Sequence, residues 1–376
     1  MRRLVQALLG VLALSSLSCG PKLNPNEIRI GEFGSLTGAQ ATFGQSTDEG
    51  IQLAVAEFNA VGGVNGKQLK VISVDDQGKP EEAAVVVTKL ITQDKVQVVL
   101  GEVASSLSLA AAPICQENKI PMITPSSTNP KVTQVGDYVF RVCFIDPFQG
   151  QVMADFALKQ LQAKTAAILR DQKSDYSMGL ADFFIKRFKE KGGTIVVDQS
   201  YVAGDIDFKS QMTGIREKKP DVVFVPGYYT EVGLIAKQAR ELGVRVPLLG
   251  GDGWDSAKLY EIGGKALEGC YFSNHYSVDS TDTKTLEFVR KYQARYNHTP
   301  DALATLGYDA AGVLVTALKQ AKSLSGPDIR DALTKTKDYP GVTGSISLDA
   351  DRNAVKPAVV LKIEGGKSSY VTTVNP

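Results

Sequence analysis

The chain has 376 residues and a formal net charge of +1, with 43% apolar and 22% charged residues. This is an ordinary globular composition, and the length indicates about two domains. The near-neutral charge argues against a nucleic-acid surface or a polybasic membrane surface, because both need a clustered excess of Lys and Arg.

The first 19 residues predict a secretory signal. Two arginines at positions 2–3 precede an apolar run over residues 4–17, and Cys19 follows at a small-residue cleavage point. A cysteine there resembles a bacterial lipoprotein signal, in which Cys19 becomes the acylated first residue, although Ser16 stands where that pattern usually has Leu. Residues 20–26 then form a short tether. Cleavage without lipidation, giving a soluble secreted protein, is the alternative.

No later segment approaches the roughly 18 apolar residues of a membrane-spanning helix. We therefore expect the mature chain in the periplasm or at the cell surface, held at the membrane only through lipid on Cys19. An oxidising compartment permits a disulfide. The later cysteines are odd in number and far apart, which favours small buried side chains over a bridge for Cys115, Cys143 and Cys270.

Short β-rich runs alternate with amphipathic stretches through the first part of the mature chain. Apolar residues at helical spacing predict helices over residues 44–61, 80–93 and 105–118. Strands are expected between and after them, over residues 28–36, 67–76, 96–101, 120–125 and 138–143. This alternation predicts a parallel sheet with helices on both faces.

The same alternation restarts after residue 144. Helices are expected over residues 147–162, 176–191, 208–218 and 231–242, and strands over residues 166–171, 194–201, 221–227 and 246–251. Near-continuous apolar runs suit parallel strands, because such strands are covered on both faces. The sequence therefore predicts an α/β fold with two Rossmann-like lobes, each built on a parallel central sheet.

The last third does not form a third domain. A strand over 269–276 is followed by helices over 285–296, 301–322 and 327–336 with no strand between them, and the tail (344–350 and 358–374) is β-rich with a Gly-Gly turn. These helices need a sheet to pack on, so the chain is expected to cross between lobes more than once. We predict an N-terminal lobe from residues 27–144 plus 276–345 and a C-terminal lobe from residues 145–275 plus 346–376.

Ligands of open α/β sheets bind at the carboxyl ends of the strands, and two such lobes leave a cleft between those ends. The expected ends carry hydroxyls in the first lobe and aromatics and acids in the second. Their segments are GSLTG (34–38), GEVASS (101–106), TPSST (124–128), RDQKSDY (170–176), PGYYTE (226–231) and GGDGWD (250–255).

The expected strand ends carry no complete set of catalytic residues. A serine nucleophile needs a base within hydrogen-bond reach, and neither histidine of the chain, His275 or His298, is expected at a strand end. No G-x-S-x-G elbow occurs. A secreted hydrolase using Ser126 or Ser127 is thus the least favoured reading, and we predict no enzyme. No Cys/His cluster has metal-ligand spacing, and no metal or cofactor is expected.

A binding site for a zwitterion fits these residues better. A carboxylate suits the hydroxyls and free N–H groups where Ser105 opens a helix, with Ser126, Ser127 and Thr128 adding donors after the next strand. An ammonium group suits Asp252, which stands between glycines. Aromatic walls around a ligand side chain are available from Phe43, Tyr176, Tyr228, Tyr229 and Trp254.

Several ordered motifs resemble one known family. They are IRIGEFGSLTG, GIQLAVAEFNAVGGVNGKQLKVISVDD, MITPSSTNP, FRVCFIDPFQG and YDAAGVLVTAL, and the resemblance runs from about residue 28 to 374. The chain is similar to type I periplasmic binding proteins of the leucine/isoleucine/valine-binding group, the extracytoplasmic receptors of ATP-binding-cassette (ABC) importers. The resemblance implies two lobes with three hinge crossings that close on a ligand, and an ABC permease as partner.

The resemblance also implies roles for single residues. Ser105 and Thr128 would hold the carboxylate and amine of an amino acid, with Ser126 and Ser127 lending backbone groups. Asp252 would bind the ammonium group, and the aromatic positions match Phe43, Tyr176 and Tyr228. The implied ligand is leucine, isoleucine, valine or a related aliphatic amino acid.

Three departures from the family pattern are visible. Asp252 replaces a Glu that is one methylene longer, Trp254 could narrow the side-chain pocket, and a disulfide of some members would fall at Gly78 and Ala104, where no cysteine stands. The first two leave an alternative open: the same fold binding an amide, a urea-like compound or an aromatic acid.

Overall fold

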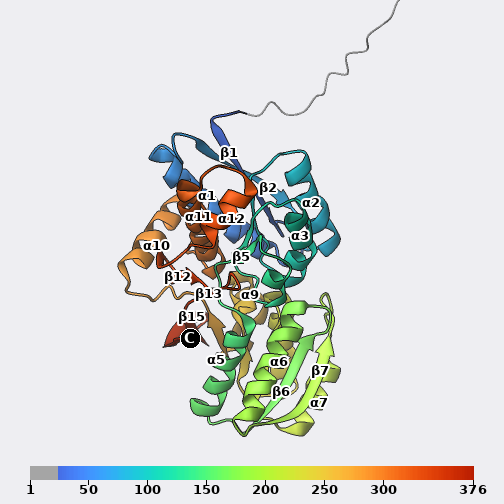
Figure 1. The fold of residues 1–376 in the computed structure, drawn as a ribbon. Coiled ribbons are helices and arrows are strands. Elements are labelled where there is room, and N and C mark those ends of the chain that lie inside the picture. Colours follow the sequence, from blue (N-terminus) through green and yellow to red (C-terminus); the bar gives the residue numbers. More distant parts are fainter. Residues whose placement is uncertain (1–23) are drawn as a thin grey trace, which may run out of the picture.

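The computed structural model describes residues 24–376, which form two lobes joined side by side (Figure 1). The predicted signal, the lipidation site Cys19 and most of the tether lie outside the described residues. The two predicted α/β arrays are confirmed as two separate sheets of five and seven strands.

The first lobe is built on a parallel sheet with the strand order β2-β1-β3-β4-β5. Its five predicted strands are confirmed, and its three predicted helices, α1 to α3, start and end within about three residues of the expected positions, whereas the short α4 was not predicted. The elements are β1 (Glu27–Gly34), α1 (Ala41–Ala60), β2 (Gln68–Asp75), α2 (Pro80–Thr92), β3 (Val98–Leu100), α3 (Ser105–Glu117), β4 (Met122–Thr124), α4 (Lys131–Gln134) and β5 (Val139–Arg141).

The second lobe is built on a sheet with the order β15-β14-β10-β9-β8-β6-β7. Strands β6 to β10 pair in parallel, whereas β14 pairs antiparallel with both β10 and β15. The predicted C-terminal hairpin is thus confirmed. The elements are α5 (Asp146–Lys159), β6 (Thr165–Asp171), α6 (Asp175–Glu190), β7 (Thr194–Tyr201), α7 (Lys209–Lys218), β8 (Val222–Phe224), α8 (Tyr229–Glu241), β9 (Leu248–Gly250), the 3-10 turn η1 (Asp252–Trp254), α9 (Ala257–Gly263), η2 (Gly264–Leu267), β10 (Tyr271–Asn274), β14 (Ala358–Glu364) and β15 (Lys367–Val374).

The helices of the last third return to the first lobe, as Figure 1 shows. Residues of α11 and α12 share one hydrophobic cluster with β1, β3, β4 and α1. Three crossings between the lobes follow, after β5, after β10 and before β14. The remaining elements are α10 (Thr283–Tyr296), α11 (Ala302–Gln320), α12 (Gly326–Leu333), β11 (Tyr339–Gly341), β12 (Gly344–Leu348) and β13 (Ala354–Val355).

The position of β12 and β13 bears on the predicted lobe boundary at residue 346. Together with β11 they form a small antiparallel sheet. Ile346 and Ala354 are buried in the hydrophobic cluster of the first lobe. The exact boundaries between the lobes stay a prediction.

Helices α1 and α11 pack very closely at Gly50. A Cβ atom on Gly50 would lie 1.9 Å from the carbonyl oxygen of Ala304, which no side chain could occupy. Helix α11 is also long and apolar enough to span a membrane by length and composition, but 83% of that apolar stretch is buried in the described part of the chain. Its burial against α1 identifies α11 as a core helix.

The three cysteines of the described residues, Cys115, Cys143 and Cys270, are free and fully buried. Burial raises the pKa of the Cys115 and Cys143 thiols to about 12. They therefore act as small apolar side chains and not as thiolates.

Candidate functional site

A small, partly open cavity lies between the lobes, where the strand ends of the two sheets face each other. Its volume is about 10 Å³, which is room for about one water molecule, so the lobes must part to admit a larger ligand. Both lobes contribute to its wall. Five of the nine predicted ligand residues are among those that line it: Phe43, Ser126, Tyr176, Tyr228 and Asp252, together with Val103, Gly253 and Leu303.

The lobes touch each other around this cavity. Ser106 Oγ lies 3.0 Å from a carboxylate oxygen of Asp175, and Asn129 Nδ2 donates to the Asp175 carbonyl at 2.7 Å. On the other side, Thr42 and Ser256 hydroxyls are 2.9 Å apart. The structure therefore represents a closed arrangement, with polar side chains of both lobes bonded across the cleft.

The loop after β4 that carries Ser126, Ser127 and Thr128, here called the hydroxyl loop, has two hydroxyls without partners. Ser126 lines the cavity, whereas Thr128 and Ser105 do not. Ser126 Oγ and Thr128 Oγ1 are buried, at 4% and 0% exposed, and neither has a hydrogen-bond partner within residues 24–376. Ser105, the first residue of α3, accepts a hydrogen bond from the Asn129 N–H at 3.2 Å, which ties the helix start to the same loop. Buried hydroxyls without partners are costly, and a ligand carboxylate or ammonium group would satisfy them.

Ser127 plays a different part from the one expected. Its hydroxyl lies within 2.7–2.9 Å of Ser108 Oγ and of the Glu102 and Val103 carbonyls, and its N–H donates to Thr124 Oγ1. Ser127 does not line the cavity. Its polar groups fasten the loop to β3 and α3, so we correct its role from ligand contact to support of Ser126 and Thr128.

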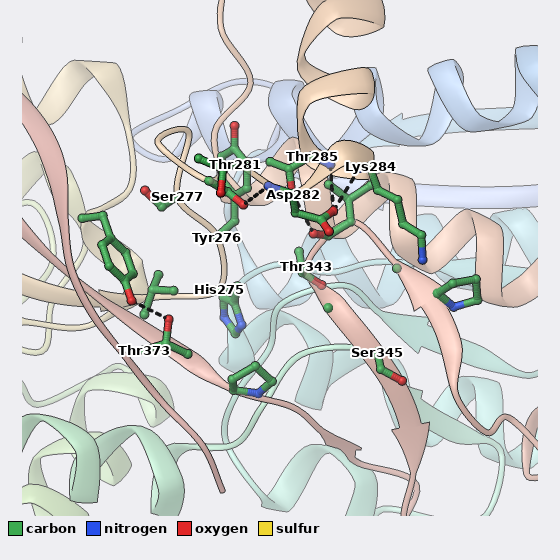
Figure 2. A pocket seen from close by; sticks show the side chains of 18 of the residues that line it. His275, Tyr276, Ser277, Thr281, Asp282, Lys284, Thr285, Thr343, Ser345 and Thr373 are labelled. Atoms are coloured by element: carbon green, nitrogen blue, oxygen red, sulfur yellow. Dashed lines mark hydrogen bonds between the residues drawn. The ribbon is translucent and has the colours of Figure 1, made fainter.

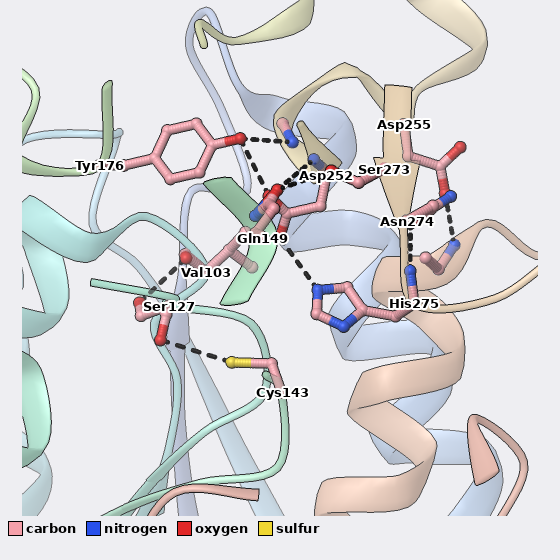
Figure 3. Close-up of polar contacts among 12 residues, drawn as sticks. Val103, Ser127, Cys143, Gln149, Tyr176, Asp252, Asp255, Ser273, Asn274 and His275 are labelled. Atoms are coloured by element: carbon pink, nitrogen blue, oxygen red, sulfur yellow. Dashed lines mark hydrogen bonds and ion pairs between the residues drawn. The ribbon is translucent and has the colours of Figure 1, made fainter. Parts of the chain in front are cut away.

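Asp252 is the centre of a buried hydrogen-bond network in the second lobe (Figure 3). One of its carboxylate oxygens accepts from Gln149 Nε2 and from Tyr176 OH, each at 2.9 Å. The other is bonded to His275 Nε2 at 3.0 Å. The network holds the carboxylate in one orientation at the cavity wall and stabilises its charge.

His275 corrects the expectation that neither histidine stands at a strand end. Strand β10 ends at Asn274, so His275 follows it directly, and its ring stacks on Phe144 with centroids 3.7 Å apart. Burial lowers the pKa of His275, against the opposing effect of Asp252. The neutral ring therefore donates its Nε2–H to Asp252, a positioning role.

Aromatic rings form the apolar side of the cavity. The Tyr176 and Tyr228 rings stack with centroids 5.2 Å apart and planes 7° apart, and Phe43 meets Tyr228 edge-on at 5.7 Å. Phe43 comes from the first lobe and both tyrosines from the second. Closure of the lobes thus completes an aromatic wall that neither lobe has alone.

Trp254 lies behind the site and does not line it. It is fully buried in the hydrophobic cluster of the second lobe, where Nε1 donates to the Val225 carbonyl at 3.0 Å. A Cβ on Gly250 would lie 2.0 Å from the Trp254 ring. The expected narrowing of the ligand pocket by Trp254 is therefore wrong, because the ring turns away into the core under β8 and β9.

Several residues near the site were not predicted. Val103 and Leu303 line it as aliphatic side chains, and Gln149 and His275 orient Asp252. Gln149 stands three residues after the start of α5, next to a crossing between the lobes. A polar residue at such a position is a candidate for the cleft. Leu303 comes from the last third of the chain and carried no local signal.

A group of buried carboxyls stands beside the site in the first lobe. The Ser35 hydroxyl lies 3.1 Å from Asp76 and 3.0 Å from Glu102, linking the two. Burial raises the pKa of Asp76 to about 6 and that of Glu102 to about 8, and nearby Asp76 adds to the rise at Glu102. Burial also raises the pKa of Glu32 well above its ordinary range.

These carboxyls predict that the protein loses stability as pH rises. A raised folded-state pKa contributes stability that is complete below the unfolded-state value of about 4 and is lost as pH rises through about 6 and 8. We expect the free energy of unfolding to fall by about 1 to 3 kcal/mol between pH 5 and pH 9. Urea unfolding between pH 5 and pH 9 measures this fall. In the Glu102→Gln variant the free energy of unfolding should fall less steeply in the upper part of that pH range. An equally steep fall in the variant would assign the effect to other groups.

A larger cavity of about 830 Å³ lies elsewhere, on the hinge side of the lobes (Figure 2). It is lined by the segment after β10, the β11–β12 turn and the C-terminal hairpin. His275 belongs to its wall, but none of the predicted ligand residues does. Among residues 24–376 no group of three or more His, Cys, Asp or Glu side chains could hold a metal ion.

Known proteins with similar sequences and structures bind small solutes. A Leu/Ile/Val-binding protein of Rhizobium johnstonii is 32% identical over 94% of this chain and 96% of its own. The branched-chain amino acid transporter substrate-binding protein LivJ of Streptococcus pneumoniae, solved with isoleucine, has a TM-score of 0.89 and 38% identity over 93% of this chain and 100% of its own. A solute-binding protein of an ABC transporter from R. palustris, solved with benzoate, has a TM-score of 0.85 and 25% identity over 93% and 97%.

The family comparison covers almost all of the described residues. Residues 27–367 match the family described as periplasmic binding protein. The two α/β lobes, the three crossings and the closed cleft between strand ends agree with this match and with the predicted type I fold. The chain therefore belongs to the periplasmic binding protein family and has the fold of an extracytoplasmic solute-binding receptor.

Proposed function

We propose that the cavity between the lobes captures a branched-chain or related aliphatic amino acid, such as leucine, isoleucine or valine, for an ABC importer. One observation carries the proposal. A fixed carboxylate, Asp252, and two unpartnered hydroxyls, Ser126 and Thr128, stand at one buried site between two lobes. An α-amino acid supplies the ammonium and carboxylate groups that such a site needs.

The ligand would be divided between the lobes. Its carboxylate is assigned to Ser105 and to free N–H groups at the start of α3, where the helix dipole favours an anion. Its ammonium group is assigned to Thr128 and Asp252. Its side chain would contact the aliphatic and aromatic wall, formed by Phe43, Val103, Tyr176, Tyr228 and Leu303.

Capture would proceed by lobe closure about the three crossings. The ligand first binds one lobe, and closure then removes the charged groups from water. Enclosing an ion pair stabilises the complex only when each charge keeps its hydrogen bonds. Gln149, Tyr176 and His275 keep those bonds for Asp252 before the ligand arrives.

The receptor would work outside the cytoplasmic membrane, as its family does. We propose that lipid on Cys19 anchors it there and that the closed form docks on the permease of an ABC importer. The proposed role is binding without catalysis. The partners of Ser127 include no base, and no histidine is bonded to Ser126.

Isothermal titration of protein refolded without ligand tests the proposal. Leucine, isoleucine or valine should bind with a dissociation constant of about micromolar, roughly −8 kcal/mol. Benzoate, acetamide and urea are the comparison ligands, and we expect them to bind at least tenfold more weakly. Tighter binding of benzoate would favour the aromatic-acid alternative, and tighter binding of acetamide or urea the amide alternative. An absence of heat with every amino acid would overturn the proposal.

A further inference from the structure

A second carboxyl group, Asp146, stands beside the candidate site. It is the first residue of α5, directly after the first crossing between the lobes, and it is 0% exposed. Neither of its carboxyl oxygens makes a hydrogen bond of standard geometry within the described residues, and the hydroxyl of Thr128 is close enough to lower its pKa. Its backbone N–H donates to the Thr128 carbonyl at 3.0 Å, which joins Asp146 to the hydroxyl loop.

The cation next to Asp146 is Arg141, whose two terminal nitrogens are bonded elsewhere and whose Nε–H has no partner among the described residues. Arg141 is fully buried, and its guanidinium donates to the carbonyls of Ser127 and Asn129. No ion pair joins Arg141 to Asp146 among the described residues. A buried carboxyl without a paired cation or hydrogen-bond donor is favoured in its neutral, protonated form.

We propose that Asp146 is a second acid of the ligand site, protonated in the ligand-free closed protein, which releases its proton to solvent when a ligand ammonium group binds near Thr128 and Asp252. The inference rests on the proposed amino acid ligand. The O–H bond of the Asp146 carboxyl breaks, the proton passes to a buffer base, and the carboxylate remains beside the new positive charge.

The electrostatic surroundings agree with this exchange. Burial raises the pKa of Asp146 to about 8, and Asp252 adds to the rise, while Thr128 and Arg141 act in the opposite direction. An ammonium ion within roughly 4–6 Å of a carboxyl lowers its pKa by about 1–3 units. Between pH 6 and pH 8 the ligand-free closed protein therefore holds a proton that the complex does not.

Burial raises the pKa of Glu102 and lowers that of Lys356, each to about 8, whereas the tyrosines, Cys143 and Arg141 around Asp146 do not titrate in this window. Burial raises the pKa of Tyr176 and of Tyr228 well above the ordinary value, and burial raises that of Cys143 to about 12. Arg141 stays a cation, although burial lowers its pKa. Asp252 carries another carboxyl, whose charge acts on Asp146.

Glu102 is the group most easily confused with Asp146. Its pKa is also raised to about 8 by burial, and it lies on the first-lobe side of Tyr228. It is bonded to Ser35 and to the Ala104 N–H, and not to the hydroxyls assigned to the ligand. A Glu102→Gln variant therefore serves as the matched control.

The test is titration calorimetry of the full chain with leucine at pH 7, in phosphate and in Tris. Because these buffers differ in ionisation heat, the slope of binding heat against that value counts the protons released. We expect about 0.5 to 1 proton for the wild type and for Glu102→Gln, and less than about 0.2 for Asp146→Asn. The affinity of the wild type should rise about three- to tenfold from pH 6.5 to pH 7.5.

Each of the other possible results would overturn either the role of Asp146 or the proposed function. Leucine binding without proton release overturns the role of Asp146 and leaves the proposed function intact, whereas no leucine binding removes the proposed function itself. Release that persists in Asp146→Asn, or that vanishes in Glu102→Gln, assigns the proton elsewhere. If Asp146→Asn does not fold, carboxyl ¹³C NMR of the Asp-labelled wild type decides. A signal that titrates near pH 8 should shift below about pH 6 with leucine, and an unshifted signal overturns the inference.

Discussion

Asp252→Asn should weaken leucine binding by roughly 30- to 3000-fold. Breaking one partner of a buried, hydrogen-bonded charge pair costs about 2 to 5 kcal/mol, and about 1.4 kcal/mol is tenfold in affinity. Asn keeps the shape of the side chain but loses the charge that would face the ammonium group. Because Gln149, Tyr176 and His275 hold Asp252 in place, the Asn side chain should keep the same position at the cavity wall. Titration calorimetry at pH 7 measures the change.

Asp221→Asn is the matched control for this prediction. Asp221 is an exposed carboxylate at the start of β8, bonded to Thr165 and the Lys164 N–H at the end of the lobe away from the cleft. It should leave leucine affinity unchanged. An Asp252→Asn protein that unfolds like the wild type and binds leucine within threefold of it would show that the ammonium group is held elsewhere.

Trp254→Ala should lower the free energy of unfolding by about 3 to 5 kcal/mol, with a loss of leucine affinity below about tenfold in the folded protein. The first effect follows from removing a large, fully buried ring and its hydrogen bond to Val225. The second follows because Trp254 does not line the cavity. Urea unfolding and titration calorimetry at low temperature measure the two effects separately.

Tyr228→Ala gives the contrasting pattern. Tyr228 is half-buried and lines the cavity between Phe43 and Tyr176, so its removal should cost more in affinity than Trp254→Ala does. The expected separation is at least tenfold in dissociation constant. Trp254→Ala with wild-type stability and a large affinity loss would place the indole at the ligand after all.

The hydroxyl loop shows how much of a binding site can be predicted from a sequence pattern. Three adjacent hydroxyl residues after a buried strand predict donors at a cleft, and Ser126 and Thr128 are such unpartnered hydroxyls. Ser127 between them points the opposite way and is bonded to β3 and α3. Adjacent side chains of an extended segment leave on opposite sides, so one of the three had to face inward, but which one depends on the register of the loop.

Tyr176 and Trp254 were both predicted to contact the ligand, but only Tyr176 lines the cavity. Their difference also could not be read from the sequence. Both follow a strand end, and both are close to Asp252 in sequence or space. Tyr176 begins a helix that presents its ring to the cleft, whereas Trp254 ends a 3-10 turn that sends its ring under β9. A ring after a short turn points to the side where the packing leaves room for it. Gly250 has no Cβ atom, and this leaves room for the Trp254 ring.

His275 was missed for a local reason. The run GCYFSNHY predicts a strand to residue 276, which places His275 inside the strand and not after its end. The ladder with β9 ends at Phe272 and the ladder with β14 ends at Asn274, because the chain then leaves the sheet to cross to the other lobe. The end of a strand is decided by its pairing with strands that are distant in the sequence. A short stretch of sequence never contains both partners of such a pair.

The sequence by itself determined the two parallel sheets, the order of helices and strands, the C-terminal hairpin and the chemical character of the cleft. Those features arise from local periodicity, turn residues and the rule that parallel strands end together. Only the tertiary structure decided which donors stay free, that Gln149 and His275 hold Asp252, and that Asp146 and Leu303 belong beside the site. These depend on contacts between residues apart in the sequence, such as Gln149 and Asp252, which are 103 positions apart, and there packing selects one partner among many compatible side chains.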